Sequence, residues 1–231
     1  MQRDDSDARS GAMKRLLYSA VILCGLAAGT LASLWVAGRG PFRRALPVET
    51  AKGLSAAPEG AVPPHVRGPE AAPITVEEFG DFQCPPCGQL EPELRKIQEE
   101  HGTDLRLVFR QYPLTSIHRH ALEAAQASEA AALQGEFWGM HDLLFEGQGE
   151  WADVGRPKFV EYARSLGLDA ERFARDMDAE QVKARISADE RRGDAAGVRA
   201  TPSLFVNGRE LPPREMTPEG LRAAINAILR R

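Results

Sequence analysis

The sequence contains few cysteines and no basic tract. Cysteine occurs at only three of its 231 positions, and the formal net charge is −4. Residues 1–40 hold five of the 29 Lys and Arg residues and three of the 33 Asp and Glu residues, so the remaining chain carries 24 basic against 30 acidic side chains. An acidic body without a Lys/Arg-rich stretch lacks the electrostatic footprint of a nucleic-acid-binding protein. We therefore expect no nucleic acid partner.

Charged residues are also missing from one long stretch near the N-terminus. Residues 16–38, LLYSAVILCGLAAGTLASLWVAG, carry no charge. As a helix they would span about 30 Å, the thickness of the hydrocarbon core of a bilayer. Tyr18 and Trp35 lie near the two ends, where amphipathic rings prefer the membrane interface. The stretch predicts a transmembrane signal anchor that is not cleaved.

Two other interpretations of residues 16–38 stay open, a cleaved signal peptide and a buried core helix. The apolar core of a signal peptide is shorter, at about 7–15 residues. Four basic residues precede the segment and three follow it, which slightly favours a cytoplasmic N-terminus by the positive-inside rule. We expect a single-pass protein of the cell (inner) membrane, with the remaining chain on the extracytoplasmic, periplasmic side.

The rest of the sequence divides into a linker and a folded domain. Residues 39–68 contain five prolines with scattered Gly and Ala and sustain no helical or strand period, which is typical of a linker. Residues 1–15 form a short N-terminal tail. We expect the domain over residues 69–231, with a large helical insertion at about 114–197.

The expected domain alternates strand and helix signals. Alternating β-branched and apolar residues predict strands, and apolar residues at helical spacing predict helices. Asn207-Gly208 is a hairpin signal, and Thr217 followed by Pro218 is typical of a helix start. The expected elements are strands at 74–79 and 104–109, a helix at 85–100, the helical block, the hairpin and a final helix. This order predicts an α/β layered domain with a helical cap.

Cys84 and Cys87 stand three residues apart in the stretch GDFQCPPCGQL. A structural zinc site commonly takes four ligands in two pairs, and no knuckle-like second pair accompanies them, so we expect no metal. A purely structural disulfide closing so short a loop removes little entropy from the unfolded chain. Redox chemistry explains more, because Cys84 is expected to begin a helix, where unpaired N–H groups and the helix dipole stabilise a thiolate. Cys87 then lies on the same helix face and can resolve a mixed disulfide.

Several segments carry a resemblance to a known family. HVRGPEAAPITVEEFGDFQCPPC resembles the start of the catalytic domain of DsbA-like, BdbD-type thiol–disulfide oxidoreductases of the thioredoxin superfamily. LRLVFRQYPL, HRHALEAAQASEAA, QGEFWGMHDLLFE and GVRATPSLFVNG are similar to later segments of that family in the same order. The resemblance covers about residues 65–228. It implies an α/β thioredoxin fold with a large helical insertion, in agreement with the pattern of elements above.

The resemblance also implies site residues beyond the two cysteines. Thr201 and Pro202 match the family's cis-proline loop, which packs beside the CxxC motif and offers backbone to a substrate peptide. Glu78 matches a buried carboxylate beneath the active site, and strand alternation places it on an apolar face. Burial would raise the pKa of Glu78 and suit it to taking a proton from Cys87. Glu77, on the opposite face, is expected to be exposed.

The turn around the motif differs from the family's strongest oxidants. Pro85 fits the first helical turn, where its missing N–H has no partner. Pro86 stands where strongly oxidising members often carry a histidine that helps to stabilise the thiolate. Reduction potentials in such proteins range from about −120 to about −270 mV, and Pro-Pro does not place this protein within that range. Asp81 is expected to support the turn rather than take part in chemistry.

Together these features predict a membrane-anchored thiol–disulfide oxidoreductase that introduces disulfides into thiol-containing exported proteins. The resemblance implies a quinone-linked membrane reoxidase of the DsbB or VKOR type as partner, and no bound cofactor is needed. Two alternatives stay open. One is a thiol reductase or isomerase of the same fold, and the other is a non-enzymatic, membrane-tethered peptide-binding module whose dithiol stays idle.

Overall fold

The computed structural model describes residues 53–230 of the chain. The predicted tail, the predicted signal anchor at residues 16–38 and the first part of the predicted linker lie outside these residues. Within residues 53–230, no helix combines the length and the apolar character that crossing a bilayer requires.

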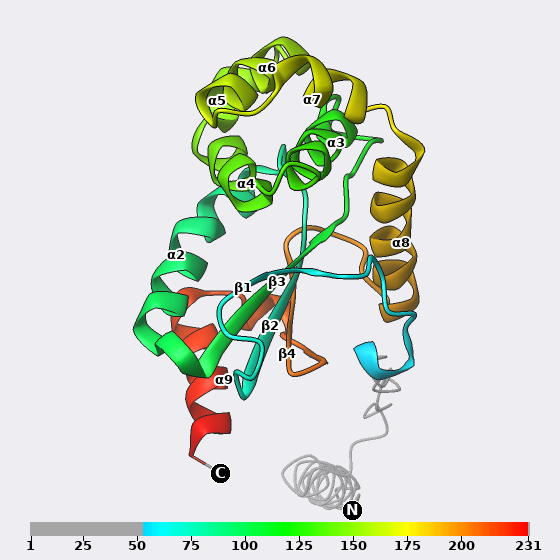
Figure 1. Cartoon of the computed structure of the whole chain (residues 1–231). Coiled ribbons are helices and arrows are strands. Elements are labelled where there is room, and N and C mark those ends of the chain that lie inside the picture. The colour runs from blue at the N-terminus through cyan, green and yellow to red at the C-terminus, as the bar shows by residue number, and fades with distance from the viewer. Residues whose placement is uncertain (1–52, 231) are drawn as a thin grey trace, which may run out of the picture. The chain divides into compact units, whose positions relative to one another are not determined.

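A mixed sheet of five strands forms the centre of the domain, in the order β1-β3-β2-β4-β5 (Figure 1). The parallel strands β2 (Ile74–Gly80) and β3 (Leu105–Gln111) lie in the middle. Antiparallel to them run β1 (His65–Arg67), which pairs with β3, and β4 (Ser203–Val206), which pairs with β2. The short β5 (Arg209–Glu210) completes the sheet beside β4. The expected strands and hairpin are therefore confirmed.

Helices cover both faces of the sheet. One face packs against α2 (Pro85–His101) and α9 (Pro218–Leu229), whose leucines and isoleucines form one hydrophobic cluster with Ile74 and Val76. The 3-10 turns η2 (Gly102–Asp104) and η3 (Pro213–Glu215) lead into β3 and α9. The other face packs against α8 (Glu180–Ala196), as Figure 1 shows. Because both faces are covered, every residue of β2 except Thr75 is buried.

The helical insertion sits over the end of the sheet at which β2 stops (Figure 1). It comprises α3 (Ala121–Ala132), α4 (Phe137–Glu146), the single turn α5 (Gln148–Trp151), α6 (Arg156–Ser165) and α7 (Ala170–Asp176), and it ends with α8. Its aromatic side chains form a hydrophobic cluster that also contains Cys84 and Cys87. The predicted insertion is confirmed, and its core reaches the two cysteines.

Two local signals near the C-terminus act as expected. Asn207 and Gly208 both have positive φ, at 47° and 79°, as a tight two-residue hairpin turn requires. The Oδ1 atom of Asn207 also accepts the N–H of Thr75 at 2.7 Å, which joins the turn to the start of β2. The hydroxyl of Thr217 accepts the N–H of Gly220 at 3.1 Å and caps α9.

The folded part of the chain begins before residue 69, which corrects the predicted linker boundary. The short turn η1 (Leu54–Ala56) places Leu54 in a buried cluster, and β1 belongs to the sheet. The proline-rich segment between η1 and β1 has no helical or strand pattern in its sequence. Arginine side chains, rather than a helix or a sheet, bind its backbone carbonyls. Arginines of β3 and α8 donate to the carbonyls of residues 58, 61 and 63 at 2.7 to 2.9 Å.

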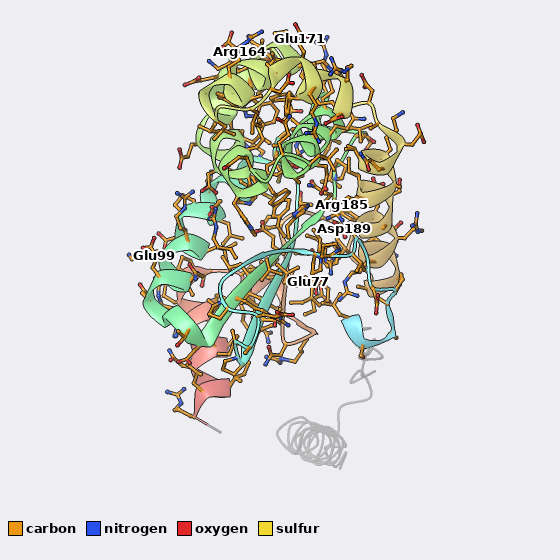
Figure 2. The ribbon with its side chains drawn as sticks, viewed as in Figure 1. Glu77, Glu99, Arg164, Glu171, Arg185 and Asp189 are labelled. Carbon is orange, nitrogen blue, oxygen red and sulfur yellow. The ribbon has the colours of Figure 1, made fainter. Side chains whose placement is uncertain are left out.

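Glu77 is buried, contrary to the expectation that it is exposed. Its carboxylate pairs with Arg110 at 2.7 Å and with Arg192 at 2.7 Å, and Arg110 also pairs with Asp189 at 3.0 Å. Figure 2 shows Glu77 and Asp189 between the sheet and α8. Burial opposes ionisation, but the hydrogen bonds and charges of the two arginines hold the pKa of Glu77 below its usual range. Strand alternation alone could not reveal this, since it does not show that α8 covers the second face.

Replacing Glu77 by Leu should destabilise the domain strongly. The substitution leaves two nearly buried guanidinium groups without their shared carboxylate, and breaking one side of a buried ion pair typically costs about 3–5 kcal/mol. Urea unfolding at neutral pH measures the change. The control is Glu180→Gln, which removes an exposed partner of Lys183 and should change stability by less than about 0.5 kcal/mol. Equal stabilities for the two variants would contradict the anchoring role of Glu77.

Candidate active site

The two cysteines lie where β2 passes into α2. After Gly80 the chain makes a turn in which the N–H of Cys84 donates to the Asp81 carbonyl at 3.0 Å. Cys84 is the N-cap residue of α2, and the two prolines occupy its first positions. Proline is tolerated there because the first N–H groups of a helix have no carbonyl partner within it. The sequence CPPC therefore folds as a helix start with the first thiol at its positive end.

Both thiols are free and buried, and Cys84 touches the loop before β4. The Sγ atom of Cys84 lies 3.3 Å from the Thr201 carbonyl oxygen, to which it donates when the thiol is protonated. The peptide bond between Thr201 and Pro202 is cis, which confirms that prediction. Because β2 and β4 are antiparallel neighbours with Phe79 opposite Ser203, the end of one strand and the start of the other meet at this point. The structure thus brings together Cys84, Cys87, Thr201 and Pro202.

The surroundings of the two thiols shift their pKa values in opposite directions. A hydrogen bond from the Cys87 thiol, together with the nearby Thr201 hydroxyl and Cys87 N–H, lowers the pKa of Cys84 despite its burial. Full burial raises the pKa of Cys87. The hydrogen bond from its thiol to Cys84 and the negative charge of Glu78 raise this pKa further. At neutral pH the thiolate therefore forms on Cys84. Cys87 keeps its proton.

Glu78 lies beneath the pair, on the strand face that α2 covers. It is 6% exposed and lines a small cavity of about 10 Å³ with Val76, Leu94 and Phe109. That volume corresponds to about one water molecule. Burial, the charge of Glu91 and the charge of Cys84 raise the pKa of Glu78 to about 8. A carboxyl group that can gain or lose a proton near neutral pH thus stands beside the buried thiol.

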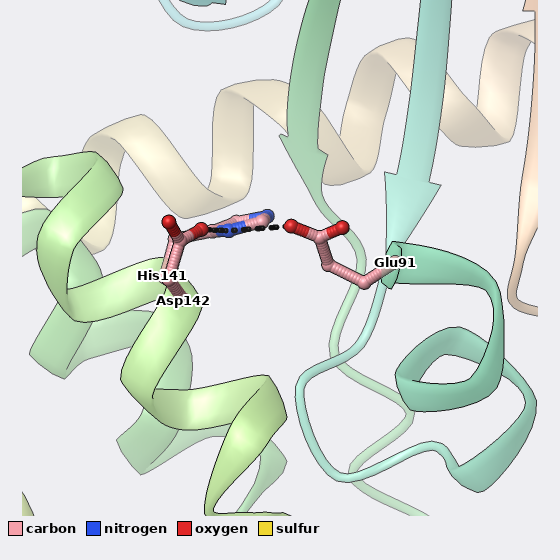
Figure 3. A group of neighbouring side chains, drawn as sticks. All are labelled: Glu91, His141 and Asp142. Atoms are coloured by element: carbon pink, nitrogen blue, oxygen red, sulfur yellow. Dashed lines mark hydrogen bonds and ion pairs between the residues drawn. The ribbon is translucent and has the colours of Figure 1, made fainter. Parts of the chain in front are cut away.

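Glu91, His141 and Asp142 form a second polar cluster between α2 and α4 (Figure 3). The Nδ1 atom of His141 lies 2.9 Å from Asp142 and 3.9 Å from Glu91. Burial lowers the pKa of His141 to about 4, so the ring is neutral at pH 7. Burial also raises the pKa of Glu91 to about 7, against the opposing charge of Arg95. The donor atoms resemble a metal ligand set, and their surroundings decide whether a cation fits.

Two arginines already occupy the positions around this cluster. Arg67 binds Asp142 at 2.8 Å, and Arg95 lies 3.2 Å from Glu91. Their guanidinium charges compensate the carboxylates, so a divalent cation does not fit the cluster. Sequence reasoning missed Glu91, although a signal existed: it falls on the buried stripe of α2, between Leu90 and Leu94. A charged residue in an apolar helix stripe marks a buried polar site.

Asp81 supports the turn before Cys84, as expected. Its carboxylate is 1% exposed and accepts the backbone N–H groups of Gln83 at 2.8 Å and Leu114 at 2.9 Å. It also lies 2.7 Å from the Nδ1 atom of His118. These bonds join the turn to the loop that leads into the insertion. The charge of Asp81 opposes thiolate formation on Cys84, so its contribution is structural.

Known structures with the same architecture include thiol–disulfide oxidoreductases. Oxidised BdbD from Bacillus subtilis superposes with a TM-score of 0.65 at 25% identity, over 76% of this chain and 99% of that one. A thioredoxin-like oxidoreductase from Silicibacter pomeroyi gives 0.63 at 28% identity, over 73% and 93%. DsbA2 from Pseudomonas aeruginosa gives 0.57 at 26% identity, over 71% and 92%.

Curated relatives of the sequence carry a different name. The Na(+)/H(+) antiporter NhaA 3 of Salinispora tropica is 39% identical over 210 residues, which is 87% of this chain and 31% of that protein. The antiporter NhaA 1 of Salinispora arenicola is 46% identical over 145 residues, which is 63% of this chain and 22% of that protein. The chain thus spans less than a third of the length of these relatives.

A family model described as thioredoxin matches residues 61–227, well over half of the chain. The match begins just after η1 and includes the five strands, both cysteines and the cis-proline loop. Together with the structural matches, it confirms the resemblance read from the sequence segments. The chain belongs to the thioredoxin family, as a DsbA-like member of its superfamily.

Proposed function

We propose that this protein is a thiol–disulfide oxidoreductase that passes the Cys84–Cys87 disulfide to the thiols of exported proteins. The observation that carries the proposal is the asymmetry of the pair. Cys84 sits at a helix N-terminus against the cis-proline loop with a lowered pKa, and Cys87 is buried with a raised one. Such an arrangement gives one attackable sulfur and one resolving thiol.

The oxidised pair reacts in two exchange steps. A substrate thiolate attacks the sulfur of Cys84, which forms a mixed disulfide and breaks the Cys84–Cys87 bond. The leaving thiolate of Cys87 takes a proton, and Glu78 supplies it from beneath the helix. A second substrate thiolate then attacks the substrate's own sulfur in the mixed disulfide and releases Cys84 as a thiolate. The substrate loses two electrons, and the pair gains them.

The cis-proline loop is the proposed peptide-binding surface. The Thr201 carbonyl already contacts the Cys84 sulfur, so a substrate sulfur bonded to Cys84 comes beside this backbone. Pro202 follows Thr201 through a cis bond and has no N–H group. We assign Thr201 and Pro202 to substrate binding, and Pro85 and Pro86 to the shape of the exposed rim around Cys84.

The lowered pKa of Cys84 favours the oxidase direction. A stabilised thiolate stabilises the reduced pair, which makes the disulfide a stronger oxidant. Reoxidation is then assigned to a quinone-linked membrane protein of the DsbB or VKOR type. The proposed setting is the periplasmic side of the cell membrane, with residues 16–38 as the anchor. The two sulfurs carry the electrons themselves, so the exchange needs no bound cofactor.

We do not propose sodium–proton antiport, the activity for which the curated relatives are named, as the activity of this chain. Sodium–proton antiport is the named activity of proteins of which this chain matches 31% or less. A thiol reductase or isomerase of the same fold is the alternative closest in chemistry, and a measurement of the reduction potential distinguishes it from an oxidase. Substitution of Cys84 distinguishes an oxidoreductase from the non-enzymatic peptide-binding module.

Replacing Cys84 by Ser should abolish disulfide exchange, because Ser removes the sulfur that lies against the cis-proline loop. Replacing Cys87 by Ser should instead accumulate mixed disulfides with substrates, since the resolving thiol is missing. The measurement is oxidation of a reduced two-cysteine peptide by the full-length protein, followed by non-reducing electrophoresis. If Cys84→Ser binds its protein partners with wild-type affinity, the binding module is the correct function.

The equilibrium of the pair with glutathione buffers decides the direction of electron flow. For an oxidase we expect a midpoint near about −120 to −180 mV, because the thiolate of Cys84 stabilises the reduced state. The measurement follows the fraction of free Cys84 and Cys87 thiols by alkylation across a buffer series. A midpoint near about −270 mV would assign the protein to the reductases.

Glu78→Gln should slow exchange and alter the pH dependence of stability. Loss of the proton carrier for Cys87 should reduce the exchange rate by at least about tenfold. The raised pKa of Glu78 means that the folded state holds a proton that the unfolded state releases, so the stabilising effect is present below about pH 4.5 and lost as pH rises through about 8. The variant should therefore exceed the wild type in stability at pH 8, by at least about 1 kcal/mol.

Urea unfolding at pH 5 and pH 8 measures this second effect. The matched control is Glu99→Gln, which changes an exposed carboxylate on the outer side of the same helix that covers Glu78 (Figure 2). The control should follow the wild type at both pH values. Identical pH dependence for Glu78→Gln and the wild type would rule out a buried, proton-holding carboxyl at this position.

A further inference from the structure

Gln148, the first residue of α5, binds the backbone at the redox pair. Its Nε2 group donates to the Phe82 carbonyl at 2.7 Å and to the Cys84 carbonyl at 3.0 Å. The turn that carries Gln148 is itself firmly held, because Trp151 is fully buried and its Nε1–H donates to the Leu144 carbonyl at 2.7 Å. A carboxamide of the insertion thus reaches the residue whose sulfur is attacked.

A second carboxamide makes the reciprocal connection. The Oε1 atom of Gln83 accepts the N–H of His120 at 2.6 Å, and its Nε2 group donates to the Ala152 carbonyl at 2.9 Å. Gln83 directly precedes Cys84, while His120 precedes α3 and Ala152 follows α5. The active-site turn is therefore bound to the insertion from both directions.

Gly88 provides independent evidence that the position of Gln148 matters. A Cβ atom at Gly88 would lie 3.0 Å from the Oε1 atom of Gln148 and 3.3 Å from its Cδ and Nε2 atoms. Such contacts are closer than carbon side chains normally allow. Glycine inside a helix is unfavourable relative to alanine, so its presence in the first turn of α2 needs a local reason. Room for the Gln148 amide supplies that reason.

We propose that Gln148, supported by Gln83, is a positioning residue that holds the Cys84 backbone so that its sulfur stays at the start of α2, against the Thr201 carbonyl. The Cys84 carbonyl accepts the N–H groups of Cys87 at 3.1 Å and Gly88 at 3.2 Å in addition to Gln148. A carbonyl oxygen has two lone pairs, so the Gln148 amide competes with these backbone donors. The Gln148 amide thus fixes the backbone from which the Cys84 sulfur extends.

The inference rests on the redox role proposed for Cys84, and the groups around its sulfur are few. The Cys87 thiol and N–H come from α2, the Thr201 hydroxyl and carbonyl from the cis-proline loop, and the Asp81 carboxylate from the turn. Glu78 lies close enough for its charge to interact with Cys84. Gln148 contacts none of the titrating atoms, so its effect must pass through the backbone.

Gln148→Leu and Gly88→Ala test this role in the full-length protein. Both variants should displace or remove the amide, raise the midpoint of the thiolate absorbance titration, and slow alkylation of Cys84 below that midpoint by about three- to tenfold. The matched control is Gln134→Leu. The carboxamide of Gln134 also binds backbone, because it accepts the N–H of Asp169 at 3.0 Å and donates to the Asp169 carbonyl at 3.2 Å. Both residues lie within the insertion and away from the cysteines.

The control should lose thermal stability and keep the wild-type titration and alkylation rate. A wild-type titration in both Gln148→Leu and Gly88→Ala would overturn the inference, and so would an equal shift in the control. If Gln148→Leu fails to fold, Gly88→Ala decides alone, because alanine favours the helix. A wild-type protein that shows the expected titration but no exchange with glutathione would overturn the proposed function and leave this inference standing.

Discussion

The contact between the Cys84 sulfur and the Thr201 carbonyl is the interaction around which the domain is arranged. It requires that the end of β2 and the start of β4 lie side by side, which the antiparallel pairing of Phe79 with Ser203 provides. It also requires that a helix begin at Cys84, so that the sulfur lies at the positive end of the helix dipole.

Glu77 and Glu78 are neighbours on β2 and both are 6% exposed, but their surroundings shift their pKa values in opposite directions. Two arginines bind Glu77 and keep it ionised, so it fastens α8 to the sheet. Glu78 faces α2 and a cavity the size of one water, and burial keeps it protonated near neutral pH. A strand covered on both faces can thus hold a structural charge on one side and a proton reservoir on the other. The difference depends only on whether a counter-charge reaches the carboxylate.

Local signals explain why so much of the fold and site could be predicted. The β-branched alternation at Ile74–Gly80, the positive-φ residues of the hairpin and the Thr217 cap each act within a few residues, so the sequence displays them directly. The CxxC motif with its downstream Thr-Pro is equally visible. The misses at Glu77 and at the linker boundary involve partners distant in sequence. Arg192 reaches Glu77 from 115 residues away, and α8 arginines bind a proline-rich segment that no period marks.

The helical insertion is part of the redox site and not an addition to a complete thioredoxin domain. Cys84 and Cys87 belong to the hydrophobic cluster formed by the insertion's aromatic side chains. The carbonyl of Cys84 and both ends of the Gln83 amide bind insertion backbone or side chains. Cys84 is only 4% exposed, so a substrate sulfur must enter along the rim that the insertion, the prolines and the cis-proline loop share. In the proposed exchange, insertion residues would therefore contribute to the selection of thiols together with the thioredoxin core, because both surround the Cys84 residue.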